Sequence, residues 1–398
     1  MNVSRLLTSC GAVLIASVSG AGLWGSSVVP ASASELQQTN LVSNVVVPAN
    51  PAKLIDSNLV NAWGIAEGPS TPFWIPDNGA GLATIYSVPP TNASVTKAGF
   101  SVIVPPAAGA TMSNPTGQVF NGFAGGFKLS DGSPATFLFD SEDGAISGWN
   151  PALGFGPGAV NGRIAVNNGN KDAVYKGLAI DDAGGSLYAA NFHSGEIEMY
   201  NSSFGLVKTF TDPTLPAGYA PFDVKVMNGE LYVTFALQDS AMHDDVAGPG
   251  HGFVDVFDLS GGGMKRLISG GALDSPWGLA IAPSSFGSFG GDLLVGNFGD
   301  GMINAYDPTT GALIGALDGT DGKPLTIDGL WGLTFGNGSA GGGSLNALYF
   351  TAGPNGESDG LFGSLTAVPE PSTWAMLLAG FTALACAGYL RSFKSAAA

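Results

Sequence analysis

A short motif returns six times along the chain, and no other feature limits the possible folds as strongly. Its clearest copies place Trp or Lys before Gly and continue with alternating apolar residues, as in Trp63-Gly64 and Lys176-Gly177. The copies occupy residues 61–66, 116–120, 176–180, 221–225, 275–281 and 330–335. From Gly64 to Gly332 the five steps average about 54 residues, a period that suits four-stranded propeller blades.

Each copy is followed by a turn rich in Gly, Asp or Asn and then by an apolar strand. These second strands are predicted at residues 73–76, 135–139, 186–189, 230–233, 292–295 and 347–350. Alternating third and fourth strands follow, for example at residues 195–200 and 205–210. Short strands with period-two alternation and no helical periodicity predict an all-β fold.

We therefore predict a six-bladed β-propeller of four-stranded blades over residues 38–366. The last blade lacks an obvious fourth strand, and we expect residues 41–47 to supply it, which would close the ring and hide the sheet edges. Glycine in the motif fits a strand lining the central channel, where blades approach closely. We interpret Trp63, Trp277 and Trp331 as packed between blades, with ligand stacking as the alternative.

Composition excludes several function classes. The 398 residues hold 14 Lys and Arg against 31 Asp and Glu, a formal net charge of -17, so the basic surface that nucleic-acid binding requires is missing. The two cysteines, Cys10 and Cys386, fall in terminal apolar segments. The body of the chain therefore has no catalytic thiol, cysteine zinc site or iron–sulfur cluster.

The first 33 residues have the pattern of a secretory signal peptide. Arg5 precedes an apolar stretch at residues 6–18, and Ala31-Ser32-Ala33 provides a small-residue cleavage site. The alternative is an ordinary buried N-terminal segment. We expect cleavage near Ala33 and export of the mature chain.

The C-terminal segment, residues 367–394, resembles the bacterial PEP-CTERM sorting signal, also labelled an ice-binding-protein C-terminal module. Pro369, Glu370 and Pro371 precede an apolar run at residues 374–390, long enough for one transmembrane helix, and Arg391 and Lys394 follow it. The resemblance implies a Gram-negative bacterium and an exosortase-type sorting enzyme that cuts at Pro-Glu-Pro. It also implies transient residence in the inner membrane and then display on the outer surface, often among exopolysaccharide.

The body resembles a family of uncharacterised PEP-CTERM-sorted β-propeller proteins. The resemblance spans about residues 38–366 and rests on residues 59–66, 328–333 and 351–354. It implies a fold and a destination but no established activity. Kinship to NHL, gluconolactonase and strictosidine-synthase-like propellers is an analogy at the level of the fold.

Polar residues in the loops after the second strands form the candidate ligand site. In a propeller these loops meet around one channel mouth, and convergent side-chain oxygens are what Ca²⁺ or a polar ligand requires. The candidates are Asp77, Asn78, Asp140, Asn191, His193, Gln238, Asp239, His243, Asn297 and Asp300. The alternative is that Asp and Asn occur there because they suit turns.

The longest loop, residues 238–252, adds a second hypothesis. His243 with Asp244 and Asp245 could bind a metal or shuttle a proton, although no zinc-site spacing is present. The alternative is a solvated loop. Its length on one blade alone is typical of a functional elaboration.

Residues Glu67-Gly68-Pro69 match a motif that carries a metal-binding Glu in propeller lactonases. In those enzymes the Glu opens the innermost strand, whereas Glu67 follows it, so we interpret Glu67 as a turn residue.

Two functions are consistent with these features. The favoured one is a non-catalytic, surface-displayed propeller that binds polysaccharide, protein or a small ligand. The alternative is a metal-dependent lactonase-like hydrolase or lyase at the channel mouth, with an acid from one blade and His193 or His243 as base.

Overall fold

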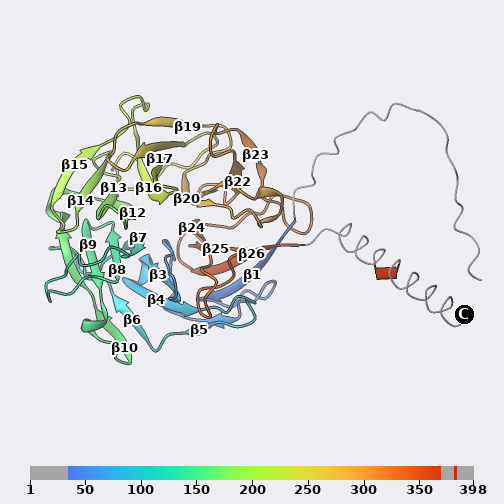
Figure 1. The fold of residues 1–398 in the computed structure, drawn as a ribbon, viewed down its shortest axis with the longest axis horizontal. Coiled ribbons are helices and arrows are strands. Elements are labelled where there is room, and N and C mark those ends of the chain that lie inside the picture. The colour runs from blue at the N-terminus through green and yellow to red at the C-terminus, as the bar shows by residue number, and fades with distance from the viewer. Residues whose placement is uncertain (1–34, 369–380, 383–398) are drawn as a thin grey trace, which may run out of the picture. The chain divides into compact units, whose positions relative to one another are not determined.

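Six antiparallel sheets follow one another in chain order around a common centre (Figure 1). The computed structural model describes residues 35–368 and 381–382. Each sheet is one blade, and the first strand of each blade lies at the channel. The prediction of an all-β, six-bladed propeller is confirmed.

Within each blade the strands are ordered from the channel to the outer edge. The first blade contains residues 62–66, which bridge to the next strand at Ala62 and Ala66, and β3 (Phe73–Asp77), β4 (Leu82–Ser87), β5 (Thr96–Lys97) and β6 (Phe100–Ile103). The second contains β7 (Pro115–Phe120), β8 (Phe137–Ser141), β9 (Ala145–Trp149) and β11 (Arg163–Asn167), while β10 (Gly158–Asn161) pairs in parallel with β6. The third contains β12 (Tyr175–Asp181), β13 (Ser186–Asn191), β14 (Glu196–Asn201) and β15 (Leu206–Phe210).

The remaining three blades repeat this order. The fourth contains β16 (Tyr219–Met227), β17 (Glu230–Leu237), β18 (Phe253–Asp258) and β19 (Lys265–Ser269). The fifth contains β20 (Pro276–Ile281), β21 (Leu293–Asn297), β22 (Ile303–Tyr306) and β23 (Leu313–Ala316). The sixth contains β24 (Leu330–Phe335), β25 (Ala347–Ala352) and β26 (Leu361–Ala367). Short 3₁₀ turns occur at Asn78–Ala80, Pro151–Leu153, Gly169–Lys171 and Gly287–Phe289.

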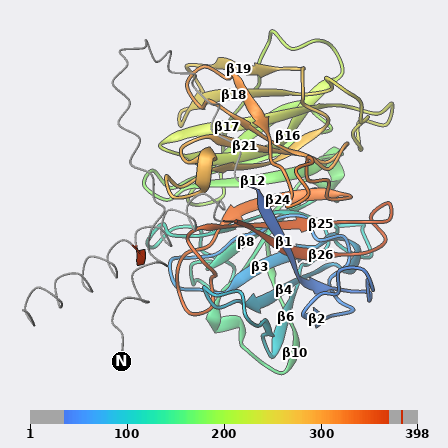
Figure 2. The same cartoon turned by 90° about the vertical axis from the view of Figure 1, so that its right-hand side faces the viewer.

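The N-terminal strand closes the ring. Strand β1 (Leu36–Ser43) pairs antiparallel with β26, with Val42 opposite Phe362, and β2 (Leu54–Ile55) pairs with β1 (Figure 2). The closing strand was expected at residues 41–47, and this position was wrong. Val45, Val46 and Val47 are 38%, 68% and 40% exposed, whereas Leu36, Leu41 and Val42 are buried, so burial of the earlier apolar residues sets the register.

Close approach of neighbouring blades explains the motif glycines. A Cβ on Gly64 would lie 2.7 Å from the Thr116 carbonyl oxygen of the second blade, and one on Gly278 would lie 2.5 Å from the Trp331 carbonyl oxygen of the sixth. The Gly64 amide donates to that Thr116 oxygen at 3.0 Å. Any larger residue at these positions would force the first strands apart.

The three motif tryptophans pack on one another in the channel and not only between sheets. Trp63 stacks on Trp331 with ring centroids 3.7 Å apart, and Trp277 meets their rings edge-on at 6.1 and 5.8 Å. All three are at least 96% buried. We call these three residues the tryptophan plug, because they fill the channel near the N-terminal ends of the first strands.

Several predictions concern segments that the structure does not describe. Residues 1–33, Pro369, Glu370 and Pro371 lie outside the described residues, as does all of the expected membrane helix except Phe381 and Thr382. Within residues 35–368 and 381–382, no helix has the length and apolar character needed to span a bilayer.

Candidate functional site at the channel mouth

Charged and amide side chains gather above the tryptophan plug, at the end of the channel where the first strands begin. They come from the segments entering the first strands and from the loops that leave the second strands. We call this group the mouth cluster, and its members are Asn61, Asn78, Glu142, Lys176, His243, Asp244 and Glu357. The cluster joins residues from five blades.

Lys176 lies at the centre of the cluster and is 1% exposed. Its Nζ forms ion pairs with Glu142 and, at 3.2 Å, with Asp244, and it lies 5.0 Å from the centroid of the Trp63 ring. Burial alone would lower the pKa of this lysine, but the two carboxylates more than offset burial and raise it. Lys176 is therefore a buried, fully charged ammonium group.

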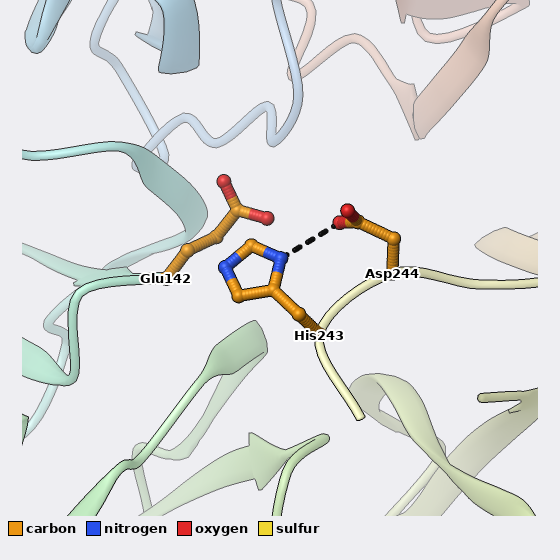
Figure 3. Close-up of side chains that lie close together, drawn as sticks. All are labelled: Glu142, His243 and Asp244. Carbon is orange, nitrogen blue, oxygen red and sulfur yellow. Dashed lines mark hydrogen bonds and ion pairs between the residues drawn. The ribbon is translucent and has the colours of Figure 1, made fainter. Parts of the chain in front are cut away.

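His243 and Asp244 come from the long loop between β17 and β18 and face Glu142 from the second blade. The Nδ1 atom of His243 lies 2.9 Å from Oδ1 of Asp244 (Figure 3). One ligand atom from each of Glu142, His243 and Asp244 lies within 4.8 Å of the others. The hydrogen bond to Asp244 raises the pKa of His243, and the same bond holds the pKa of Asp244 well below its usual range.

Amide groups tie a third carboxylate to this group. Asn78 donates to Oε2 of Glu142 at 2.8 Å, and Asn61 donates to Asn78 at 3.3 Å and to Oε2 of Glu357 at 3.1 Å. Asn61 in turn accepts from Nε1 of Trp331 at 3.1 Å. Burial first, and then the charge of Glu142, raises the pKa of Glu357 to about 7.

The loop carrying His243 is shaped by its own residues. Asp239 accepts from the amides of His243 at 2.9 Å and Asp244 at 3.3 Å, and its own amide donates to the carbonyl of Asp244 at 2.8 Å. An Asp side chain that caps following amides forms such a turn without help from the rest of the fold. The turn presents both side chains to the mouth.

Of the ten predicted site residues, Asn78 and His243 lie in the mouth cluster. Most of the others bond to backbone groups of their own or neighbouring segments. Asn191 accepts from the Val174 and Ser194 amides, Gln238 donates to the Phe192 carbonyl, and Asn297 donates to Ala272 and Asp300. Asp300 also accepts from the Met302 amide, Asp239 shapes the loop described above, and His193 is half-buried outside the cluster.

Asp77 and Asp140 are fully buried beneath the mouth. Asp140 accepts from the Thr116 hydroxyl at 2.9 Å and the Gly117 amide at 2.6 Å, and so holds the first strand of its blade. Burial raises the pKa of Asp140 to about 7 and that of Asp77 well above its usual value. Asp140 thus supports the first strand of its blade, whereas neither carboxylate oxygen of Asp77 has a hydrogen-bond partner within residues 35–368.

Sequence reasoning did not single out Glu142, Lys176, Asn61 or Glu357, and it weighed Asp244 only as a neighbour of His243. One signal was present: Lys176 occupies the motif position that holds Trp in three other copies. A lysine at a motif position that holds a buried Trp in three other copies indicates that carboxylates pair with its ammonium group in the fold.

The donor set favours a transition-metal cation over Ca²⁺. Two carboxylates and one imidazole match the ligands of Zn²⁺ or Co²⁺, whereas Ca²⁺ takes six to eight oxygens. The ammonium of Lys176 competes for the same carboxylates. A metal ion would therefore have to displace this lysine from Glu142 and Asp244.

Comparison with known proteins identifies relatives in a giant virus. The chain is 33% identical over 266 residues to "Uncharacterized protein L690" of Acanthamoeba polyphaga mimivirus, covering 64% of this chain and 67% of that protein. It is 32% identical over 265 residues to "Uncharacterized protein R648" of the same virus, covering 64% and 63%. No protein-family model matches the chain.

Solved structures share the fold. A protein of unknown function from Bacteroides thetaiotaomicron aligns with a TM-score of 0.50 and 12% identity, covering 84% of this chain and 77% of that one. A gluconolactonase from Xanthomonas campestris aligns with a TM-score of 0.35 and 18% identity, covering 58% and 82%. At these identities the likeness concerns the propeller fold and not the chemistry.

Proposed function

The chain belongs to the same family as the mimivirus protein L690, and we propose that it is a non-catalytic binding propeller whose mouth takes a divalent cation on Glu142, His243 and Asp244. One observation carries this proposal: ligand atoms of these three residues, from two blades, lie within 4.8 Å of one another. Three carboxylates of the mouth cluster face a single lysine, so the site has an excess of negative charge for a cation to neutralise.

The test is a titration of the purified chain with Co²⁺, which reports its ligands through its visible absorption. One equivalent of Co²⁺ should produce a saturable spectrum in the wild type, and Zn²⁺ should displace it. His243→Ala should abolish the spectrum. His251→Ala is the matched control, because His251 lies in the same loop but bonds to the Val246 carbonyl. Equal Co²⁺ binding by the two variants would exclude this site.

A second candidate function is a metal-dependent hydrolase or lyase acting at the same mouth. The hydrogen bond between Asp244 and Nδ1 of His243 favours it, because a carboxylate that orients an imidazole leaves the other ring nitrogen available to take a proton. If the Zn²⁺-loaded chain hydrolyses lactones and His243→Gln does not, the hydrolase or lyase function would be favoured over non-catalytic binding.

We also propose that the propeller works outside the cell. The signal-peptide pattern of residues 1–33 and the Pro369-Glu370-Pro371 sorting pattern support export and processing by an exosortase-type enzyme. A formal net charge of -17 supports solubility among exopolysaccharide or envelope proteins and disfavours nucleic acid. Fractionation of the producing cell, with immunodetection at the outer surface, tests this part.

A further inference from the structure

The opposite half of the channel contains a cavity that the mouth cluster does not use. It has a volume of about 470 Å³ and lies between the later residues of the first strands. Its rim includes the exposed residues Pro69, Gly122 and Asp182, so the cavity opens to solvent at that end. Its volume is within the range of about 300–1,000 Å³ that is typical of small-molecule sites.

Two polar side chains in this cavity lack partners within the described chain. Gln118 is 94% buried, and neither its amide nitrogen nor its oxygen has a hydrogen-bond partner in residues 35–368. Oε2 of Glu67 is also buried without a partner there, while Oε1 accepts from Thr334 at 3.2 Å. Buried polar atoms normally find a partner, so a wall that leaves three of them free is prepared for a hydrogen-bonding guest.

This placement corrects the interpretation of Glu67 as a simple turn residue. Glu67 follows the first strand of its blade, as expected, but its side chain lines the channel cavity. The position also differs from a metal-binding Glu at the start of the innermost strand, because it lies at the other end of the channel from the mouth cluster.

Asp223 and Lys225 of β16 complete the polar wall. Nζ of Lys225 donates to the Leu333 carbonyl at 2.7 Å, and Asp223 is 94% buried. Burial raises the pKa of Glu67 to about 7 and also raises the pKa of Asp223. Burial lowers the pKa of Lys225. Burial disfavours the charged form of each group, and the buried wall sets two acidic side chains against one lysine, so a charged guest would lose its hydration without meeting a wall of opposite charge.

Apolar side chains cover the rest of the cavity wall. They include Ile65, Leu178, Leu279 and Leu333, and Trp277 of the tryptophan plug separates the cavity from the mouth cluster. Free donors and acceptors beside an aromatic ring and aliphatic side chains match a molecule with several hydroxyl groups and an apolar face.

We propose that this cavity is a second ligand site, which binds a neutral polyhydroxylated molecule of monosaccharide size through Gln118, Glu67 and Lys225. A hydroxyl group both donates and accepts, so it can satisfy the Glu67 carboxyl and the Gln118 amide alike. The site is independent of cation binding at the mouth, because the tryptophan plug lies between the two.

Saturation-transfer NMR on the purified full chain tests the proposal. The probes are D-glucose, D-galactose and D-mannose at millimolar concentration, with D-glucosamine and D-gluconate as charged counterparts. At least one neutral sugar should bind saturably and more tightly than both charged derivatives. Gln118→Leu removes two unpartnered polar atoms but keeps the bulk of the side chain, and it should weaken sugar binding about tenfold. Glu67→Gln should weaken sugar binding by less.

Matched controls separate this site from the mouth and from loss of folding. Gln37→Leu, on the exposed side of β1, and Glu230→Gln, at the exposed start of β17, should bind like the wild type. Loading the mouth with Co²⁺ should leave sugar binding unchanged. The proposal is overturned if no neutral sugar binds, if a charged derivative binds as tightly, or if a stably folded Gln118→Leu variant retains full affinity.

Discussion

Trp63 of the first blade stacks on Trp331 of the sixth with ring centroids 3.7 Å apart, so the two ends of the ring meet inside the channel as well as at its edge. Trp331 also donates to Asn61, which belongs to the mouth cluster. Trp331 therefore both holds the first and sixth blades together and helps to position Asn61 in the mouth cluster.

Replacing Trp331 by Ala should destabilise the propeller by about 3–5 kcal/mol, because it leaves a large cavity and removes four ring contacts. Urea unfolding followed by circular dichroism measures the change. Leu313→Ala, at a residue that is 52% exposed, is the control and should shift stability by less than about 0.5 kcal/mol. Equal effects would show that the tryptophan plug is not a stabilising element.

The register of the closing strand is tested by a matched pair. Val42→Ser should cost about 2–3 kcal/mol because Val42 is fully buried opposite Phe362, and a hydroxyl would be placed in an apolar site. Val46→Ser should be nearly neutral, since Val46 is 68% exposed. Chemical denaturation of both variants measures the two costs, and a larger cost for Val46→Ser than for Val42→Ser would contradict the observed position of β1.

The buried carboxyl of Asp140 should make stability fall as the pH rises. Its pKa is about 7 in the folded protein and about 3.8 when unfolded, so between these pH values the folded chain binds more protons than the unfolded chain. The free energy of unfolding falls by as much as about 4 kcal/mol by pH 7.

Asp140→Asn should flatten the curve of unfolding free energy against pH between pH 4 and pH 7. Part of the remaining slope comes from Glu67, Asp255 and Glu357, and the raised pKa values of Asp77 and Asp223 act in the same direction. Unfolding at several pH values measures both curves, and an unchanged slope in the variant would contradict the prediction.

Asp244→Asn should lower the pKa of His243, because the hydrogen bond that the imidazole donates to the Asp244 carboxylate is the main cause of its elevation. An NMR titration of the imidazole Cε1 proton measures the shift directly. The resonance of His193, in the third blade, provides an internal reference that the substitution should not move. A His243 titration that stays at its wild-type position would show that the pair does not form in solution.

Lys176→Met should strengthen Co²⁺ binding at the mouth by about tenfold or more, because the ammonium that pairs with Glu142 and Asp244 competes with the metal for both carboxylates. The methionine keeps the length of the side chain above Trp63. Calorimetric titration at one pH and ionic strength gives the ratio of affinities. Unchanged or weaker binding in a folded variant would place the metal elsewhere.

The sequence predicted the architecture well because each blade repeats the same local pattern. Five motif copies form first strands, the first copy pairs through bridges at Ala62 and Ala66, and each copy is followed by the expected second strand. The closing strand was placed too late because residues 37–40 are polar whereas residues 45–47 are three valines, and only burial against the sixth blade shows that residues 36–43 form the strand. Local pattern determines the elements, whereas the register between chain ends depends on distant contacts.

The candidate site was harder to predict for the same physical reason. Asp and Asn suit both turns and ligands, so residues such as Asn191 and Asn297 looked like ligands while they actually brace their loops. Lys176 and Glu142 come together only when the second and third blades pack side by side. Their pairing across 34 residues leaves no periodic signal in the sequence.

The pairing of β1 with β26 sets the order in which the protein can mature. The strand that begins at Leu36 pairs early with the two-residue β2, but its long partner is missing until the ribosome has made the strand that ends at Ala367. At about 5–20 residues per second, the first strand waits for tens of seconds while the blades after it can already form. The ring therefore cannot close until the sixth blade has been made, and a chain that stops before that point would present an open blade edge to protease and chaperone.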